Sequence, residues 1–163
     1  MLSYRHGYHA GNFADVFKHL ILVYLIEKNK TKKPFTFIDA FAGAGKYFIK
    51  DTFMQKNKEY LNGISKIINV KTNLSLINKY LDIVKSFNKK NKFEIYPGSC
   101  LIASKLTDKQ DNLYFSELHN NEFLNLENNF KDDKRVKIEK INAYQNLNKI
   151  ISKYKGQKLI LID

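Results

Sequence analysis

Hydrophobic residues come in short blocks along the chain, and their spacing alternates between helical and strand periods. Asn12 can cap a helix running to about Lys28, in which positions 16–26 are apolar nearly all round, as in a buried helix. The segment FTFID at 35–39 is short, rich in β-prone residues and followed by a glycine-rich turn. It predicts a buried strand.

Two segments with helical periodicity follow this strand, at 59–68 and 76–87. In the second, apolar residues recur at the spacing that places them on one face of a helix. We therefore predict a helical insertion spanning about 50–91.

The second half of the chain alternates strand and helix patterns. Residues 93–96 are a short strand candidate, Pro97 and Gly98 turn the chain, and Ser99 can cap a short helix. Alternating strands and helices of this length imply crossover connections and a parallel sheet, and thus a single α/β domain over 1–163. The further strands and helices are expected at 113–117, 122–130, 136–141, 144–154 and 159–163.

The last five residues, LILID, have a buried-strand pattern that ends in a carboxylate. This is the middle of an α/β unit, so we expect the sheet to be incomplete at its C-terminal side and the chain to be part of a longer protein.

Composition favours a folded, basic protein. The chain has 163 residues, of which 44% are hydrophobic and 13% aromatic, enough for a real core. Its 28 Lys and Arg against 16 Asp and Glu give a net charge of +12, which attracts polyanions such as nucleic acids, although a Lys- and Asn-rich composition can also be a genome-wide bias.

The sequence gives no indication of a membrane or secreted protein. The apolar run at 20–26 is too short to span a bilayer, and the polar, aromatic start does not resemble a signal peptide. The lone cysteine, Cys100, cannot form an internal disulfide. We therefore expect a cytoplasmic location.

The glycine turn FIDAFAGAGKY has the chemistry of a ligand-binding turn, because Gly43 and the glycine two positions on let the backbone approach a ligand closely. A phosphate-binding loop would need glycine at Ala40 and serine or threonine at Tyr47, and a dinucleotide fingerprint would need glycine at Phe48. A methyltransferase turn asks only for GxG and an acidic residue at the strand end, here Asp39. An ordinary strand-to-helix turn has the same sequence.

Glu117 ends the strand pattern LYFSE. A carboxylate at this position of a nucleotide-binding sheet can accept hydrogen bonds from ribose hydroxyls, so the residue favours an adenosyl ligand. It can equally be an exposed acid that starts a helix.

Five segments carry a resemblance to a known family: MLSYRHGYHAGNFADVFKH, FIDAFAGAGKY, YPGS, FSELH and LILID. In order and spacing, over the whole chain, they resemble the bacterial 23S ribosomal RNA adenine-N6-methyltransferases of the RlmJ type. The resemblance implies a Rossmann-like methyltransferase sheet with an inserted helical subdomain. It also implies use of S-adenosylmethionine to methylate the exocyclic amine of one adenine in 23S ribosomal RNA, preferably RNA that lacks its full set of ribosomal proteins.

The resemblance also implies roles for individual residues. Tyr4 and His6 match positions near the target base, and Asp163 matches the first residue of the catalytic DPPY motif, whose carboxylate accepts a hydrogen bond from the adenine amine. The cofactor-binding positions are Lys18, His19, Phe41, Gly43, Ser99, Glu117, Asn142, Ala143 and Asp163.

Three positions depart from the family pattern. Phe41 stands where well-known members carry a histidine, and Asn142 with Ala143 replace an Asp-Gly pair that contacts the cofactor's adenine. Asn142 can still donate or accept a hydrogen bond, so we expect changed affinity and an unchanged reaction.

The chemistry expected of such a site needs no metal. An aromatic amine is a poor nucleophile, and acceptors such as Asp163, together with proximity and electrostatic preorganisation, would favour its attack on the sulfonium methyl. The base must leave its stack, and Tyr4 is a surface on which it could rest. A metal cluster of His6, His9, Asp15 and His19 is conceivable, but no cysteine accompanies it and Asp15 fits a first-turn helix acid.

Two other functions stay open from the sequence alone. One is a basic RNA-binding module without catalysis, and the other is a DNA adenine-N6 methyltransferase. Binding of the cofactor would distinguish a methyltransferase from the RNA-binding module. Parallel methylation assays on RNA and on duplex DNA would distinguish an RNA methyltransferase from a DNA methyltransferase. The oligomeric state is open, with a monomer expected for a full-length member.

The sequence predicts that this 163-residue chain keeps part of the cofactor site but has absent or very weak turnover, because it ends at the first residue of the catalytic motif. The measurement is methyl transfer to protein-free 23S ribosomal RNA. Robust methylation by the 163-residue chain would contradict this prediction.

Overall fold

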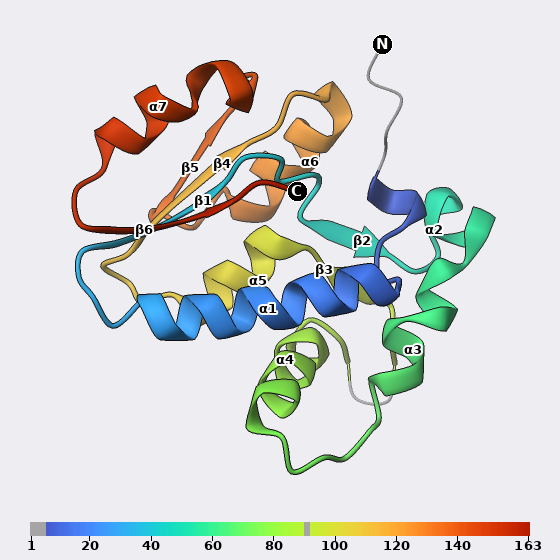
Figure 1. Cartoon of the computed structure of the whole chain (residues 1–163). Coiled ribbons are helices and arrows are strands. Elements are labelled where there is room, and N and C mark those ends of the chain that lie inside the picture. Colours follow the sequence, from blue (N-terminus) through green and yellow to red (C-terminus); the bar gives the residue numbers. More distant parts are fainter. Residues whose placement is uncertain (1–5, 90–91) are drawn as a thin grey trace.

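A parallel four-stranded sheet in the order β5-β4-β1-β6 organises the protein, with helices on both faces (Figure 1). The computed structural model describes residues 6–89 and 92–163. The sheet strands are β1 (Phe35–Asp39), β4 (Asn112–Ser116), β5 (Val136–Glu139) and β6 (Gln157–Leu161). The main helices are α1 (Phe13–Asn29), α4 (Ser75–Ser86), α5 (Ser99–Leu106), α6 (Asn120–Phe130) and α7 (Ala143–Lys153).

The strands alternate their side chains between two hydrophobic clusters, as parallel strands covered on both faces should. Phe37 and Phe115 belong to the larger cluster, on the face covered by α1, α5 and α6. Ile38 and Tyr114 point to the other face, where they pack with Ile150 of α7. The predicted α/β class with a parallel sheet is confirmed.

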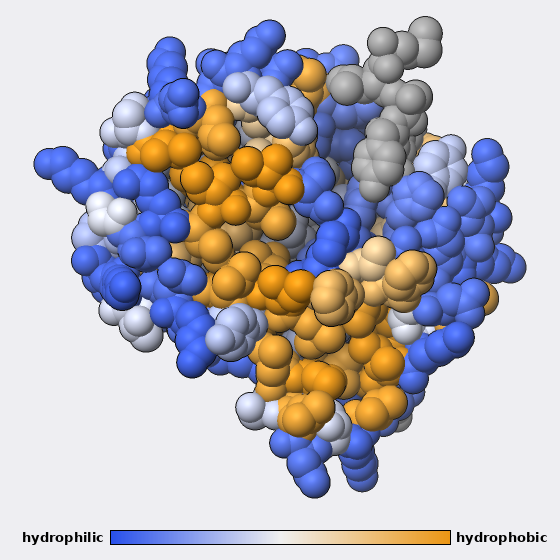
Figure 2. Space-filling model, viewed as in Figure 1, coloured by the Kyte–Doolittle hydropathy of each residue, from blue (hydrophilic) through white to orange (hydrophobic). Residues whose placement is uncertain are grey.

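Helix α1 begins as predicted. Asn12 accepts a hydrogen bond from the Asp15 amide at 2.9 Å, which satisfies one of the free amides of the first turn. The prediction that the helix is buried is wrong for one of its sides, because within 16–26 Phe17 is 64% and Ile21 42% exposed. Figure 2 shows a broad apolar region on the face that α1 occupies in Figure 1. In the part of the chain described here, no helix is both long and apolar enough to cross a bilayer.

The last strand also departs from its prediction. Strand β6 spans Gln157–Leu161, so Ile162 and Asp163 lie beyond it, and all five of its residues are half-buried. The residues of β6 are only half-buried because this strand lies at the edge of the sheet. In the described part of the chain, β1 is the one strand that pairs with it.

A second, two-stranded antiparallel sheet pairs β2 (Lys46–Phe48) with β3 (Ile95–Pro97). The sequence did not predict β2, and it predicted a strand at 93–96 followed by a turn at Pro97. In the structure, Pro97 pairs with Lys46, and the ribbon lies outside the parallel sheet.

Helices lie between β2 and β3, where the insertion was predicted. Besides α4 they are α2 (Thr52–Asn57), the 3-10 turn η2 (Glu59–Asn62) and the one-turn α3 (Ile64–Ile67). The predicted helix at 59–68 is thus broken at Gly63. Ile64, Tyr80 and Leu81 belong to the same core cluster as the sheet. The insertion therefore shares one core with the sheet, and its status as a subdomain stays a prediction.

Gly63 holds the insertion against the start of α1, and its replacement tests that junction. A Cβ atom at Gly63 would lie 2.1 Å from the Gly11 carbonyl oxygen and 2.4 Å from the Asn12 carbonyl carbon. Because both are backbone atoms, we expect Gly63→Ala to lower the free energy of unfolding by about 2–3 kcal/mol. Urea unfolding measures this loss.

The matched control is Gly7→Ala, whose added Cβ would have side-chain atoms of Phe53 as its nearest neighbours, the first at 3.2 Å. Its loss of stability should be smaller. Equal effects of the two substitutions would contradict a rigid backbone junction at Gly63.

Candidate active site

A cavity of about 390 Å³ opens at the carboxyl ends of the sheet strands, the place where open α/β sheets bind ligands. Of the predicted site residues only Tyr4 falls outside the described part of the chain. All the others line this cavity, from seven separate stretches of sequence: His6, Lys18, His19, Phe41, Gly43, Ser99, Glu117, Asn142, Ala143 and Asp163. The structure brings these residues together, and their individual roles stay predictions.

The glycine turn and Glu117 are in direct contact. Glu117 Oε2 accepts a hydrogen bond from the Gly43 amide at 2.8 Å, and its Oε1 accepts one from the His119 amide at 2.7 Å. Gly43 has φ 59°, a left-handed conformation that suits glycine. Two backbone amides therefore fix the carboxylate of Glu117 at the cavity wall.

Asp39 lies beneath the glycine turn and is 1% exposed. It accepts hydrogen bonds from the Ser99 hydroxyl at 2.5 Å and from the Phe41 amide at 3.2 Å. Burial raises the pKa of Asp39 to about 6, and the nearby carboxylates of Asp163 and Glu117 add to the rise, while these two hydrogen bonds oppose it. Asp39 thus ties the end of β1 to the start of α5.

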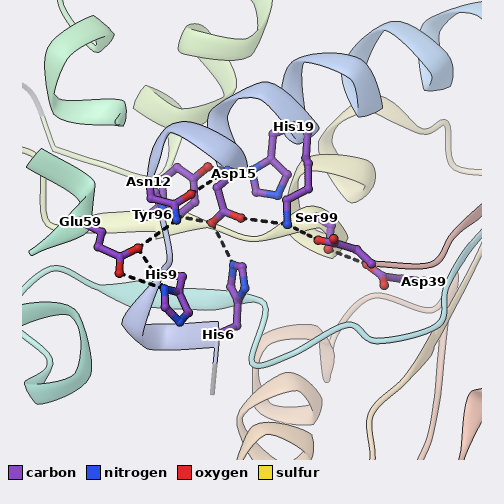
Figure 3. A network of polar contacts seen from close by, with 12 residues as sticks. His6, His9, Asn12, Asp15, His19, Asp39, Glu59, Tyr96 and Ser99 are labelled. Atoms are coloured by element: carbon purple, nitrogen blue, oxygen red, sulfur yellow. Dashed lines mark hydrogen bonds and ion pairs between the residues drawn. The ribbon is translucent and has the colours of Figure 1, made fainter. Parts of the chain in front are cut away.

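Ser99 does not cap its helix as predicted. Gly98 is the N-cap residue of α5, and Ser99 is the first residue of the helix. Its hydroxyl points instead to Asp39 (Figure 3). The reason is the buried carboxylate of Asp39, which needs a donor that the end of the sheet does not supply.

The N-terminal segment forms a polar network around Asp15 (Figure 3). Asp15 is 2% exposed, and its Oδ2 accepts hydrogen bonds from the Gly11 amide and from His6 Nε2, both at 2.9 Å. Burial alone would raise the pKa of Asp15, but the hydrogen bonds from His6 and from the Gly11 amide help to outweigh it and hold this pKa well below its usual range. Asp15 is therefore an ionised anchor for His6.

Lys18 and His19 extend this network into the cavity. Lys18 Nζ lies 3.6 Å from Asp15 Oδ1 and donates a hydrogen bond to Asp163. His19 Nδ1 lies 2.8 Å from the Tyr96 hydroxyl, and the two rings stack with centroids 5.6 Å apart. Burial lowers the pKa of His19 to about 4, although the charge of Asp15 opposes this, so His19 is neutral at pH 7.

At the far end of the cavity, two buried polar atoms have no hydrogen-bond partner among the described residues: Asn142 Oδ1 and His119 Nδ1. An unpaired buried acceptor is costly, so a cavity that leaves one on its wall is suited to a ligand with an N–H donor.

The sequence analysis did not single out several residues of the cavity. His119 and Leu118 could have been found from their place directly after Glu117. Tyr144 follows the predicted Asn142 and Ala143, and nothing in its sequence context distinguishes it from a solvent-facing helix residue. It is 75% exposed and contacts Phe41.

The four residues considered as a metal cluster make hydrogen bonds in separate pairs. His9 pairs with Glu59 at 3.0 Å, His6 with Asp15, and His19 with Tyr96. Within residues 6–89 and 92–163, no group of three or more His, Cys, Asp or Glu side chains is arranged to hold a metal ion.

The parallel order β5-β4-β1-β6, the acidic residue ending β1 and the glycine turn beneath Glu117 define a Rossmann-like methyltransferase fold. Comparison with known proteins gives the family. A family model described as ribosomal RNA large subunit methyltransferase D, RlmJ, matches residues 32–163. The chain belongs to this family.

Comparison with individual relatives supports the same family assignment. The chain is 40% identical to ribosomal RNA large subunit methyltransferase J of Escherichia coli and 36% identical to that of Haemophilus influenzae, in each case over 100% of its length. A crystal structure of a Legionella pneumophila protein superimposes with a TM-score of 0.80 and 34% identity, covering 88% of this chain and 53% of that one. The chain spans 59% of the length of the two named methyltransferases.

The raised pKa of Asp39 predicts a pH-dependent stability. In the unfolded chain this carboxyl ionises near 3.8, and in the folded chain near 6, so folding favours its protonated form. The stabilisation is complete below about pH 3.8 and is lost as the pH rises through about 6. Asp39→Asn removes this loss, so its stability relative to the parent should rise by up to roughly 3 kcal/mol between about pH 3 and 7.

Urea unfolding across this pH range measures the difference between the two proteins. The control is Asp82→Asn, which removes an exposed aspartate of α4 and should give a difference that stays flat. A flat difference for Asp39→Asn as well would show that Asp39 ionises normally.

Proposed function

We propose that this chain forms the S-adenosylmethionine site of an enzyme that methylates an adenine N6 amine in 23S ribosomal RNA. The observation that carries the proposal is the hydrogen bond between Glu117 and the Gly43 amide inside one cavity. It joins a nucleotide-type carboxylate to a methyltransferase-type glycine turn. Both E. coli and H. influenzae relatives are named ribosomal RNA large subunit methyltransferases.

The residues of the cavity fit the parts of S-adenosylmethionine. The carboxylate of Glu117 is placed to accept hydrogen bonds from ribose hydroxyls. Asn142 Oδ1 is a buried acceptor without a partner and would take a hydrogen bond from the adenine amine of the cofactor. Lys18, Ser99 and the glycine turn line the same cavity and would hold the methionine part.

Bound S-adenosylmethionine supplies the electrophilic methyl group. Asp163 is 47% exposed on its side chain and lies at the mouth of the cavity, held by Lys18. Its carboxylate would accept a hydrogen bond from the target amine and favour a tetrahedral nitrogen, while the ammonium group of Lys18 keeps the carboxylate in place. His6, fixed by Asp15, lines the same cavity and would contact the target base.

The substrate assignment rests on charge and family. A net charge of +12 speeds the encounter with a polyanion such as RNA, in the cytoplasm where the lone cysteine stays reduced. Duplex DNA has the same backbone charge, so methylation assays on protein-free 23S ribosomal RNA and on duplex DNA decide between them. Binding of RNA without binding of the cofactor would favour the RNA-binding module.

Calorimetry with S-adenosylhomocysteine tests the cofactor site directly. We expect the chain to bind it, and we expect Glu117→Gln to weaken binding about tenfold to hundredfold. The reason is that glutamine has one side-chain acceptor oxygen. The carboxylate of Glu117 already accepts hydrogen bonds from two backbone amides and would also accept hydrogen bonds from the ribose hydroxyls.

The matched control is Glu127→Gln, which makes the same chemical change at an exposed position of α6. It should bind S-adenosylhomocysteine as the parent does. A folded parent chain that ignores the ligand would overturn the proposed function.

A further inference from the structure

A chain of three buried polar groups leads from the inserted helices to the cavity. His19 Nδ1 lies 2.8 Å from the Tyr96 hydroxyl (Figure 3), which in turn lies 3.1 Å from the Tyr80 hydroxyl. Tyr80 belongs to α4, Tyr96 to β3 and His19 to α1, and His19 lines the cavity. Tyr80 and Tyr96 are 0% exposed, so the protein itself must supply the hydrogen-bond partners of both hydroxyls.

His19 carries a single ring hydrogen. Burial lowers its pKa to about 4, so at pH 7 the ring is neutral, with one nitrogen as a donor and the other as an acceptor. Nδ1 is hydrogen-bonded to Tyr96, which leaves Nε2 as the nitrogen that can meet a ligand. The position of the hydrogen therefore decides whether His19 offers the cavity a donor or an acceptor.

The two tyrosine hydroxyls decide this position. In the described part of the chain, the Tyr96 hydroxyl is the one hydrogen-bond partner of the Tyr80 hydroxyl. A buried donor without an acceptor is costly, so Tyr80 donates to the Tyr96 oxygen, Tyr96 donates to Nδ1 of His19, and the ring hydrogen lies on Nε2. In the opposite direction, Nδ1 would donate to Tyr96 and Tyr96 to Tyr80, and the Tyr80 hydrogen would be buried without an acceptor.

We propose that Tyr80 and Tyr96 are positioning residues that hold His19 as the Nε2–H tautomer, with a hydrogen-bond donor available to the cavity. The inference rests on the proposed function, because it specifies how one residue of the same cavity meets the cofactor. His19 follows Lys18, which lines the same cavity, and a donor beside this positive charge suits the carboxylate of the methionine part. The inserted helix α4 then contributes to ligand binding through Tyr80.

Nitrogen-15 NMR of the imidazole rings tests the tautomer in the folded chain. Protonated and unprotonated ring nitrogens have well-separated chemical shifts, and a His19→Gln variant identifies the His19 signals among those of the four histidines. We expect Nε2 of His19 to be protonated and Nδ1 to be unprotonated at pH 7. A hydrogen on Nδ1 would overturn the proposal.

Removal of single hydroxyl groups tests the positioning role by calorimetry. Tyr96→Phe should weaken the binding of S-adenosylhomocysteine about 2-fold to 10-fold, the range for one neutral hydrogen bond. It should also move the Nδ1 signal of His19 toward that of a nitrogen without a hydrogen bond. Tyr80→Phe should have a smaller effect on both, because Tyr96 can still donate to Nδ1. A second ligand, 5′-methylthioadenosine, lacks the methionine carboxylate and should bind the parent and Tyr96→Phe equally well.

The matched control is Tyr114→Phe, which makes the same chemical change at another tyrosine that is 0% exposed. The Tyr114 hydroxyl donates to Glu139 Oε2 at 2.5 Å, and Tyr114 is outside the set of described residues that line the cavity. This variant should change neither the affinity for S-adenosylhomocysteine nor the His19 signals. Circular dichroism checks that each variant is folded.

The outcomes separate the two proposals. If the parent binds S-adenosylhomocysteine but folded Tyr96→Phe binds it equally well, the positioning role is overturned while the proposed function stands. The same holds if Tyr114→Phe weakens binding as much, or if 5′-methylthioadenosine loses as much affinity. Should Tyr96→Phe not fold, the tautomer of the parent decides. If the folded parent does not bind S-adenosylhomocysteine, the proposed function fails and the positioning role fails with it.

Discussion

The burial of one carboxylate, that of Asp39, sets the geometry of the whole cavity. At 1% exposure it cannot be hydrated, so it takes its hydrogen bonds from the Ser99 hydroxyl and the Phe41 amide. These two contacts fix the start of α5 and the first residues of the glycine turn relative to β1. The Gly43 amide is then aimed at Glu117. The wall of the cavity formed by the glycine turn and Glu117 therefore follows from satisfying a single buried charge.

The sequence predicted the parts of this arrangement that depend on local pattern. The strand ending at Asp39, the glycine turn and the acidic end of LYFSE were all found, because alternating strands and helices impose a parallel sheet whose carboxyl ends meet. What local pattern cannot supply is the partner of each side chain. Ser99 has the composition of a helix cap, and only the nearby carboxylate of Asp39 turns it to another use.

Burial was the least predictable property for the same reason. The apolar residues of α1 predict a buried helix, yet the structure leaves Phe13 and Phe17 exposed, since hydrophobicity states only a preference and the neighbouring elements decide whether it is met. The ribbon of β2 and β3 is a related case. Strand β2 has three residues, too few to show a period of two, and it exists because β3 returns to it across the insertion.

The charge balance of the cavity gives a physical reason for the neutral residue at Asn142. Asp15, Glu117, Glu122 and Asp163 line the cavity. The pKa of Asp39 is raised chiefly by burial, and the carboxylates of Asp163 and Glu117 add to the rise, so a further negative charge nearby is disfavoured. An aspartate at position 142 would add to that repulsion, whereas the asparagine amide offers an acceptor oxygen without charge. The aromatic surface of Phe41 and Tyr144 beside it likewise adds contact area without charge. In this chain, the residues at the start of α7 therefore line the cavity with neutral groups, whereas Asp15 and Lys18 come from α1.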